Sequence, residues 1–438
     1  MDAFPLVERP DGEALFLRPS GPVHAPAFLA DAHRLASELP GSGPVLNLCR
    51  DRYAFMVAFA AALIRGRVCL LSGDPSPTML AAVTQAHPGC VAAIDDPEVT
   101  APAPLHLVRP EGRAGAAPNP AIPARQLAAV VFTSGSTGAP TAHRKAWGAL
   151  VARSRAAAER FGLQGPAVGS VVGTVPPGHM YGFEVTALLP LHARCASWCG
   201  RTFFPADVQA ALDAAPAPRI LVTTPLQMRA LLGVRPPSLQ ACISATAPLD
   251  PALAAEAETR WGGPVLEIFG ATEVGSIASR RTVEGDSWRV YPGVALRRDD
   301  GVALVEAEFA PPVPLADEIE MLDADRFRLL GRRADMVKLG GRRASLAGLN
   351  RILTGLDGVC DGIFVVPDDL DQRSTARLLA VVVAPGRSAP SILADLRDRM
   401  DPIFLPRRVV HVDALPRNAL GKLPRQAVLD LLAEVDAR

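Results

Sequence analysis

One short loop has the residue types needed to hold an anion. It follows the apolar run AAVVF and comprises Thr133, Ser134, Gly135, Ser136, Thr137 and Gly138. The two glycines allow a sharp backbone turn that exposes N–H groups, and the four hydroxyls add donors suited to phosphate oxygens. The Gly-Lys-Ser/Thr ending of a Walker loop and the spacing G-x-G-x-x-G are both absent. Taken alone, the pattern also fits a plain turn between a strand and a helix.

Three later stretches carry side chains that would complete a nucleotide site. In IFGATEVGS (268–276), Thr272 can donate to a phosphate, and Glu273 can hold Mg²⁺, a hard cation that prefers oxygen ligands. Asp317 and Arg332 supply an acceptor and a donor suited to a ribose. Lys422 follows a glycine on an expected loop between two prolines. Together these residue types predict binding of a magnesium nucleotide.

Strands that alternate with helices must position these side chains. Apolar strand candidates include GPVLNL (43–48), the run before the loop (128–133) and PVLEIFG (264–270). A helix is expected from about 145 to 161, and the run AFMVAFAAALI (54–64) is expected to be a core helix. This rhythm predicts an α/β fold with a partly parallel sheet.

The last part of the chain differs in strand length and charge. Strand candidates after residue 285 are shorter and more charged, and GRRADMVKLGG (331–341) combines charge with glycine in a way suited to a mobile connection. The strands CDGIFVVP (360–367) and LLAVVVAP (378–385), with two or three amphipathic helices, predict a compact α+β unit. We therefore expect a large domain over 1–332 and a small domain over 333–438.

Composition argues against several classes of partner. The 438 residues include 45 Lys plus Arg and 45 Asp plus Glu, so no global field draws the chain to nucleic acid or to an anionic membrane. We expect no secretory leader and no membrane span, because the longest apolar run is too short. The seven cysteines are scattered, and the one C-x₃-C, at 195 and 199, lacks the second pair of a zinc site. Reduced thiols in the cytoplasm are expected.

The order and spacing of several motifs resemble the adenylate-forming superfamily. The motifs are TSGSTGAP, PPGH at 176–179, SATAPL at 244–249, FGATE, Asp317, GRRADMVK and LPRNALGK. This superfamily contains acyl- and aryl-CoA synthetases, adenylation domains of peptide synthetases and beetle luciferase. The resemblance spans about 130–425, and it implies a large multi-sheet N-terminal domain followed by a small mobile α+β domain.

The resemblance implies a role for each matched residue. The loop from Thr133 to Gly138 would embrace the β- and γ-phosphates of ATP. The adenine and acid pocket would be lined by Ser244, Ala245, Thr246, Phe269 and Gly270, with Phe269 near the adenine. Thr272 would contact the α-phosphate and Glu273 the magnesium, while Asp317 and Arg332 would bind the ribose.

The implied reaction explains the need for a lysine. A carboxylate attacks the α-phosphorus of ATP, pyrophosphate leaves, and an acyl adenylate forms. Both reactants are anions, so a point charge must lie between them, which suits the ammonium of Lys422 better than the planar fork of an arginine. The small domain would then swing to open a thiol tunnel. Its hinge would fall near Arg333 to Asp335, where Ala334 occupies the position of the family's usual carboxylate.

The chain departs from the family pattern in several places. In the family the phosphate loop usually continues Pro-Lys-Gly, whereas here Thr141 follows the proline. Either Arg144 or Lys145 replaces the missing lysine, or both side chains are solvated at the start of a helix. Ser345 occupies the place of a usual glutamate. His179 could gate the acid pocket or be a structural histidine, and Tyr181 and Phe183 could be pocket walls or core residues. Arg342 and Arg343 could steer a CoA phosphate or be solvated. His143 and His192 are expected to have no special role.

The sequence says less about the identity of the acid substrate and of the thiol acceptor. Peptide-synthetase domains hold a substrate ammonium with an Asp, but 176–191 contains only Glu184 as an acidic residue, which favours a simple carboxylic acid. PTAHRKAWGAL and GGRRASLAGLN resemble stand-alone ligases of aryl-polyene (xanthomonadin-type) pathways, which implies an aromatic acid such as a hydroxybenzoate. The acceptor would be the phosphopantetheine of an acyl carrier protein, or CoA. The alternatives are a medium- or long-chain acyl-CoA synthetase and a catalytically silent AMP- or ATP-binding module.

Overall fold

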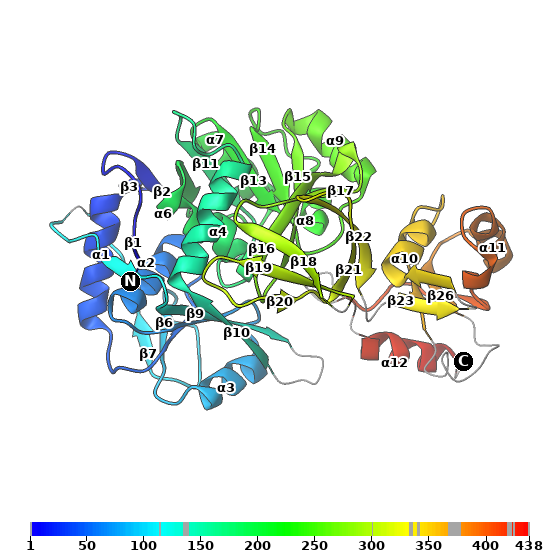
Figure 1. The fold of residues 1–438 in the computed structure, drawn as a ribbon, viewed down its shortest axis with the longest axis horizontal. Helices are drawn as coiled ribbons and strands as arrows, with labels where there is room; N and C mark the ends of the chain where they lie inside the picture. The colour runs from blue at the N-terminus through cyan, green and yellow to red at the C-terminus, as the bar shows by residue number, and fades with distance from the viewer. Residues whose placement is uncertain are drawn as a thin grey trace. The chain divides into compact units, whose positions relative to one another are not determined.

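The computed structural model describes residues 2–113, 115–134, 140–299, 301–332, 336–339, 342–366, 378–417, 423 and 425–436. It divides into two compact units. The first comprises 1–314 with 323–327, and the second comprises 315–322 with 328–438. Figure 1 labels many of the elements of both units.

A six-stranded sheet in the first unit presents the loop predicted to bind phosphate. Its order is β10-β9-β5-β4-β6-β7. The strands are β4 (Val45–Asn47), β5 (Cys69–Ser72), β6 (Val91–Ile94), β7 (Leu105–Leu107), β9 (Leu127–Ser134) and β10 (Pro140–Ala146). All neighbouring pairs are parallel except β9 with β10, which confirms the expected partly parallel sheet. The connecting helices are α2 (Arg52–Ile64) and α3 (Pro77–Ala86), whose first turns are capped by Asp51 and Ser76.

An eleven-stranded sheet forms the second layer, and nine of its strands lie wholly in the first unit. These nine run in the order β17-β16-β15-β14-β13-β11-β12-β2-β3. They are β2 (Ala14–Arg18), β3 (Gly21–His24), β11 (Gly169–Gly173), β12 (Cys195–Trp198), β13 (Arg219–Thr223), β14 (Ala241–Ser244), β15 (Val265–Ala271), β16 (Gly275–Arg281) and β17 (Ser287–Val290). The run from β2 to β15 is parallel, so the carboxyl ends of these strands meet at one edge.

Helices and two small sheets complete the first unit. The helices are α1 (Ala25–Glu38), α4 (Trp147–Arg160), α5 (Met180–Gly182), the π-helix η1 (Phe183–Leu188), α6 (Leu189–His192), α7 (Pro205–Ala214), α8 (Pro225–Leu231), α9 (Pro251–Trp261) and the 3₁₀ turn η2 (Thr282–Glu284). The small sheets pair β1 (Ala3–Pro5) with β8 (Ala121–Pro123), and β18 (Val294–Asp299) with β19 (Val302–Ala307) and β20 (Val313–Pro314). No helix among the described residues is both long and apolar enough to cross a membrane.

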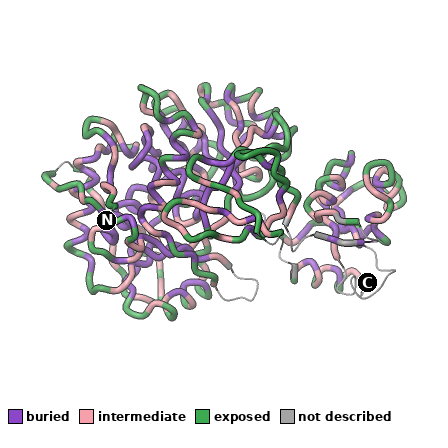
Figure 2. The backbone as a smooth tube through the Cα atoms, viewed as in Figure 1, coloured by how far each residue is buried: buried purple, intermediate pink, exposed green. Residues whose placement is uncertain are grey.

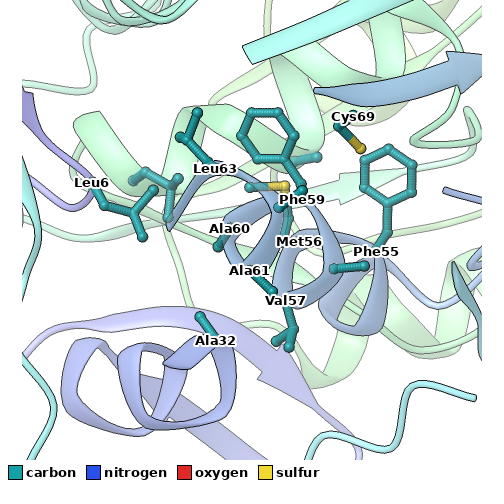
Figure 3. Packing of buried hydrophobic residues seen from close by; sticks show 14 of the residues in the cluster. Leu6, Ala32, Phe55, Met56, Val57, Phe59, Ala60, Ala61, Leu63 and Cys69 are labelled. Carbon is teal, nitrogen blue, oxygen red and sulfur yellow. The ribbon is translucent and has the colours of Figure 1, made fainter. Parts of the chain in front are cut away.

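The main core lies between the two large sheets. Helix α2 packs on β4 and β5 of the smaller sheet and on η1, which packs on β11 of the larger one. The predicted core helix is confirmed, because every residue of α2 except Ile64 is buried. Figure 2 shows the buried backbone in purple in the interior of the first unit. Phe55 and Phe59 project from one side of α2, and Val57 projects toward the helix that carries Ala32 (Figure 3).

Replacing Phe59 with alanine should lower the free energy of unfolding of the first unit by about 3–5 kcal/mol. Phe59 is fully buried, and its ring centroid lies 5.1 Å from that of Phe183 and 6.4 Å from that of Trp147. Urea denaturation followed by circular dichroism would measure the loss. Phe203→Ala is the matched control, because Phe203 is 81% exposed and its loss should change the midpoint little. Equal shifts in both variants would contradict this description of the core.

The predicted helix after the phosphate loop begins later than expected. Residues 140–146 form β10, which pairs antiparallel with β9, and α4 starts at Trp147 rather than near Lys145. The reason is visible in the exposure pattern, because His143 and Lys145 are buried while Arg144 is exposed. This alternation has the two-residue period of a strand. The loop therefore joins two strands rather than a strand and a helix.

The second unit is a small α+β assembly. Its own elements are β21 (Asp317–Met321), β23 (Met336–Leu339), β24 (Arg342–Ser345), β25 (Asp361–Val365), β26 (Leu379–Val383), β27 (Arg408–His411), α10 (Leu346–Thr354), α11 (Ala389–Arg397), the 3₁₀ turn η4 (Pro402–Phe404) and α12 (Arg425–Asp436). The strand β22 (Arg326–Arg332) begins in the first unit and ends in this one. Ser345 caps α10 by accepting a hydrogen bond from the Gly348 amide at 2.9 Å, which gives this departure from the family pattern a local structural role.

Candidate active site

The base of the predicted phosphate loop is a hairpin stem. Thr133 lies at the end of β9, and its hydroxyl is 3.0 Å from Nε2 of His143 on β10. His143 is buried, and this burial lowers the pKa of its imidazole. Gly135, Ser136, Thr137 and Gly138 lie outside the described residues, as does the side chain of Ser134. The sequence interpretation treated His143 as ordinary, whereas the structure places it against the first hydroxyl of the loop.

Lys145 projects from β10 into the interior, while its neighbour Arg144 is exposed. Its side-chain amine donates a hydrogen bond of 2.7 Å to the backbone carbonyl oxygen of Glu273. Burial lowers the pKa of Lys145 to about 8, and the carboxylates of Glu184 and Glu273 oppose that shift. Of the two alternatives for Arg144 and Lys145, solvation at the start of a helix is therefore wrong for Lys145.

The motif FGATE ends β15 and forms a tight turn into β16. The turn is closed by a hydrogen bond of 3.0 Å from the Val274 amide to the Ala271 carbonyl oxygen. Thr272 is half-buried and Glu273 is exposed, so the turn presents both predicted phosphate and metal ligands at its tip. Gly270 must lack a side chain here, because a Cβ atom would lie 2.7 Å from the carbonyl oxygen of Gly275.

Glu184 on η1 approaches the same turn from the interior. Its Oε2 atom accepts hydrogen bonds from the amide of Ser276 at 3.0 Å and from the Ser276 hydroxyl at 2.8 Å. Burial raises the pKa of this carboxyl, and the hydrogen bonds from Ser276 and the charges of Lys145 and Arg153 oppose that effect. The buried carboxylate thus accepts two hydrogen bonds from Ser276, and the charges of Lys145 and Arg153 favour its ionised form.

The predicted adenine and acid pocket maps to the ends of β14 and β15. Phe269 is buried, with ring centroids 5.7 Å from both Trp288 and Phe327. Ser244 and Ala245 are buried, and the Ser244 hydroxyl has no hydrogen-bond partner among the described residues. Thr246 is exposed with φ of 81°, a left-handed conformation that is rare for a β-branched residue. Such backbone strain is concentrated at functional sites.

The segment 179–183 combines a cap with core side chains. Nδ1 of His179 accepts a hydrogen bond of 3.3 Å from the Tyr181 amide, and this ring is half-buried. The Tyr181 hydroxyl is buried and donates to the carbonyl oxygen of Ile243 at 2.9 Å. Phe183 is fully buried beside Phe55 and Phe59, so it belongs to the main core.

The remaining predicted residues belong to the second unit. Asp317 begins β21 and is half-buried. Arg332 ends β22, and its side chain is outside the description. Lys422 and the expected hinge at 333–335 also lie outside the described residues.

Magnesium fits the donor chemistry of this turn. The exposed carboxylate of Glu273 offers hard oxygen atoms. No group of three or more His, Cys, Asp or Glu side chains suited to a metal occurs in the described part of the chain. Mg²⁺ is commonly held by one or two carboxylates together with substrate phosphates and water, so a single glutamate suffices.

A cavity of about 1040 Å³ opens at the carboxyl ends of strands from both large sheets. It is lined by residues at and just after the ends of β4, β5, β11 and β12, which is the edge where ligands bind in open α/β sheets. The charged residues of the lining are the exposed Arg50 and Arg201, the buried Arg52, and the acidic Asp51 and Glu98. Phe203 lies at the exposed part of the lining. Gly178, the residue before His179, also lines this cavity.

Comparisons with known proteins agree with this architecture. Residues 45–320 match the family described as AMP-binding enzyme. A 4-coumarate–CoA ligase of Rhodobacter capsulatus is 30% identical over 300 residues, which cover 67% of this chain and 74% of that protein. A probable 2-succinylbenzoate–CoA ligase of Mycobacterium tuberculosis is 27% identical over 338 residues, covering 69% and 84%.

Solved structures are similar over nearly the whole chain. ATP-bound MatB from Rhodopseudomonas palustris has a TM-score of 0.82 at 19% identity and 98% coverage of both chains. The O-succinylbenzoate coenzyme A synthetase of Bacillus subtilis, in complex with AMP, has a TM-score of 0.79 at 16% identity, covering 94% of this chain and 95% of that chain. These likenesses confirm the predicted fold class.

Proposed function

The chain belongs to the AMP-binding enzyme family, and from this premise we propose that it activates an aromatic carboxylic acid, such as a hydroxybenzoate, for transfer to a phosphopantetheine or CoA thiol. It is a ligase that forms a carbon–sulfur bond by way of an acyl-AMP. The observation that carries the proposal is the turn after β15, which presents Thr272 and Glu273 beside the buried amine of Lys145.

The proposed reaction has two steps. A carboxylate oxygen of the acid attacks the α-phosphorus of ATP, and the bond to pyrophosphate breaks. A thiolate then attacks the acyl carbon, and AMP leaves. In this scheme Thr272 donates to the α-phosphate, and Lys422 neutralises the two mutually repelling anions. Bound Mg²⁺, held by Glu273, would screen the phosphate charge.

Two observations support an aromatic acid without an amino group. The relatives named above are described as ligases of 4-coumarate and 2-succinylbenzoate, both aromatic acids. Glu184 is the only acidic side chain in 176–191, and it already accepts two hydrogen bonds from Ser276. The segment therefore supplies no exposed carboxylate for a substrate ammonium.

The cavity beside Gly178 is the proposed entry of the thiol. Its exposed arginines, Arg50 and Arg201, suit the phosphate groups that CoA and a carrier-bound phosphopantetheine share, whereas the buried Arg52 donates to Thr186 and to backbone carbonyl oxygens. The aromatic pair Phe203 and Phe204 is 81% and 56% exposed, and this apolar surface would suit contact with a carrier protein. A reducing compartment such as the cytoplasm is proposed as the location, because all seven cysteines are free thiols in the structure.

ATP–pyrophosphate exchange with a panel of acids tests the proposal. Hydroxybenzoates and cinnamates should exceed straight-chain fatty acids by roughly 10-fold or more in kcat/KM, because a pocket discriminates by about 1–3 kcal/mol even for a single methylene group. Faster exchange with fatty acids would favour an acyl-CoA synthetase instead. No exchange with any acid would favour a silent nucleotide-binding module.

The acceptor requires a second assay. The enzyme and its best acid would be mixed with CoA or with a phosphopantetheine-bearing carrier protein, and the thioester would be detected by mass spectrometry. A Phe204→Ser variant should impair transfer to the carrier while leaving transfer to CoA unchanged, because Phe204 is exposed but does not line the cavity. Equal transfer to the carrier by both enzymes would remove Phe204 from the proposed contact.

A further inference from the structure

We propose that Lys145 and Glu184 are positioning residues that fix the turn carrying Glu273, so that its carboxylate faces the magnesium of bound ATP. This inference rests on the proposed function. Glu184 belongs to none of the motifs that predict the site, and Lys145 enters them only as one candidate for the missing lysine of the phosphate loop. Each reaches the turn from a different element and holds its backbone at a different point.

Lys145 holds the outer part of the turn. It extends from β10, and its amine donates to the carbonyl oxygen of Glu273 itself at 2.7 Å. Only 3% of Lys145 is exposed, so water does not compete effectively for this hydrogen bond. Because the donor is charged, the bond belongs to the stronger class of hydrogen bonds.

Glu184 holds the inner part of the turn. Its carboxylate receives both the amide and the hydroxyl of Ser276, three residues after Glu273. Glu184 comes from η1, whose residues are all buried, so the anchor is rigid. Any rotation of the turn would therefore break a charge-assisted hydrogen bond at one end or the other.

The turn itself has little freedom between these anchors. Gly275 has a φ of 106°, and a Cβ atom there would lie 2.2 Å from Oε1 of Glu184. The carboxylate thus packs directly against the backbone of the turn. With residues 273 and 276 both held, the exposed side chain of Glu273 is presented from a fixed base.

The choice of residue at 145 supports a specific role. Of the 45 basic residues only three are lysines, at 145, 338 and 422. A compact ammonium on a flexible stem fits a narrow buried site better than a guanidinium does. Burying a charged side chain costs free energy that its hydrogen bonds must offset, so stability alone does not account for a buried lysine and a buried glutamate here.

The experiment compares nucleotide binding with and without magnesium. Isothermal titration would give the ATP affinity of the wild type, Lys145→Met and Glu184→Gln in Mg²⁺ and in EDTA. In Lys145→Met the affinity gained from Mg²⁺ should fall about 10- to 100-fold, as for other residues that orient a metal ligand. In Glu184→Gln the affinity gained from Mg²⁺ should fall less, because the glutamine keeps an oxygen that accepts a hydrogen bond from Ser276. Affinity in EDTA should change little.

Turnover provides a second readout. Lys145→Met should lower kcat for pyrophosphate exchange and raise the Mg²⁺ concentration needed for half-maximal rate, while KM for the acid stays near the wild-type value. Lys145→Arg, which keeps the charge, should recover part of the loss. Arg155→Met is the matched control, because Arg155 is a half-exposed cation on α4 that pairs with Glu8.

A purely structural role gives a different result. In that case Lys145→Met would lower the melting temperature but leave the magnesium dependence of the folded enzyme unchanged, which would overturn the proposal. If Lys145→Met does not fold, Lys145→Gln retains a neutral donor and takes its place in the same comparison. A wild type that shows no exchange with any acid would instead overturn the proposed function, so the two failures are distinguishable.

Discussion

Lys422→Ala is expected to slow acyl-AMP formation by about 10²–10³-fold while ATP affinity stays nearly unchanged. The physical reason is the repulsion between the carboxylate of the acid and the α-phosphate, which an ammonium between them neutralises. The amine matters most as charge develops in the transition state, so its loss appears in kcat rather than in ground-state binding. Pyrophosphate exchange and isothermal titration with ATP would measure the two quantities.

The control for this variant is Arg397→Ala. Arg397 is an exposed cation near the end of α11 in the same unit, and its loss should leave exchange unchanged. Exchange near the wild-type rate in Lys422→Ala would remove Lys422 from the proposed mechanism. Lys422 lies outside the described residues, so this assignment depends on the family motif LPRNALGK and on this measurement.

Gly275→Ala is expected to reduce kcat for exchange by about 10²-fold. The new Cβ atom would lie 2.2 Å from Oε1 of Glu184, so either the carboxylate or the turn must move. Misplacement of a catalytic group by about 1 Å can cost 10²-fold in rate, and this turn carries Thr272 and Glu273. The loss should appear in kcat and in the magnesium dependence.

Gly285→Ala is the control that separates the collision with Glu184 from the effect of backbone strain. Gly285 also has a positive φ, 122°, but a Cβ atom there would have no neighbour within 4 Å. This variant should lower stability through strain and keep its exchange rate. If Gly275→Ala and Gly285→Ala lost activity equally, the contact between Glu184 and the turn would not control the site.

Local patterns predicted the elements around the site well. The apolar runs before the phosphate loop and before FGATE form β9 and β15, and the run at 54–64 lies within the buried helix α2. These predictions succeeded because strand and helix periods are visible within a few residues. The helix expected from about 145 to 161 is present as α4, but it begins at Trp147, because PTAHRKA follows a two-residue period that directs His143 and Lys145 inward.

The supporting contacts of the site were not predictable in this way. Lys145 contacts a residue 128 positions away, and Glu184 contacts one 92 positions away. No short window of sequence contains either pair. The sequence therefore leaves Lys145 either as a replacement for the phosphate-loop lysine or as a solvated charge, and it gives Glu184 no structural role. A signal did exist, because a lysine in an arginine-rich chain and an acidic residue in an apolar segment are both unusual.

The aromatic contact between Phe269 and Trp288 has a practical consequence. Trp288 is buried, and its ring also lies 4.6 Å from the guanidinium of Arg280. An adenine at the position proposed beside Phe269 would alter the electronic surroundings of this indole. The other tryptophans, at 147, 198 and 261, lie in other parts of the first unit. Nucleotide occupancy should therefore be visible in the intrinsic emission of Trp288, without any attached dye.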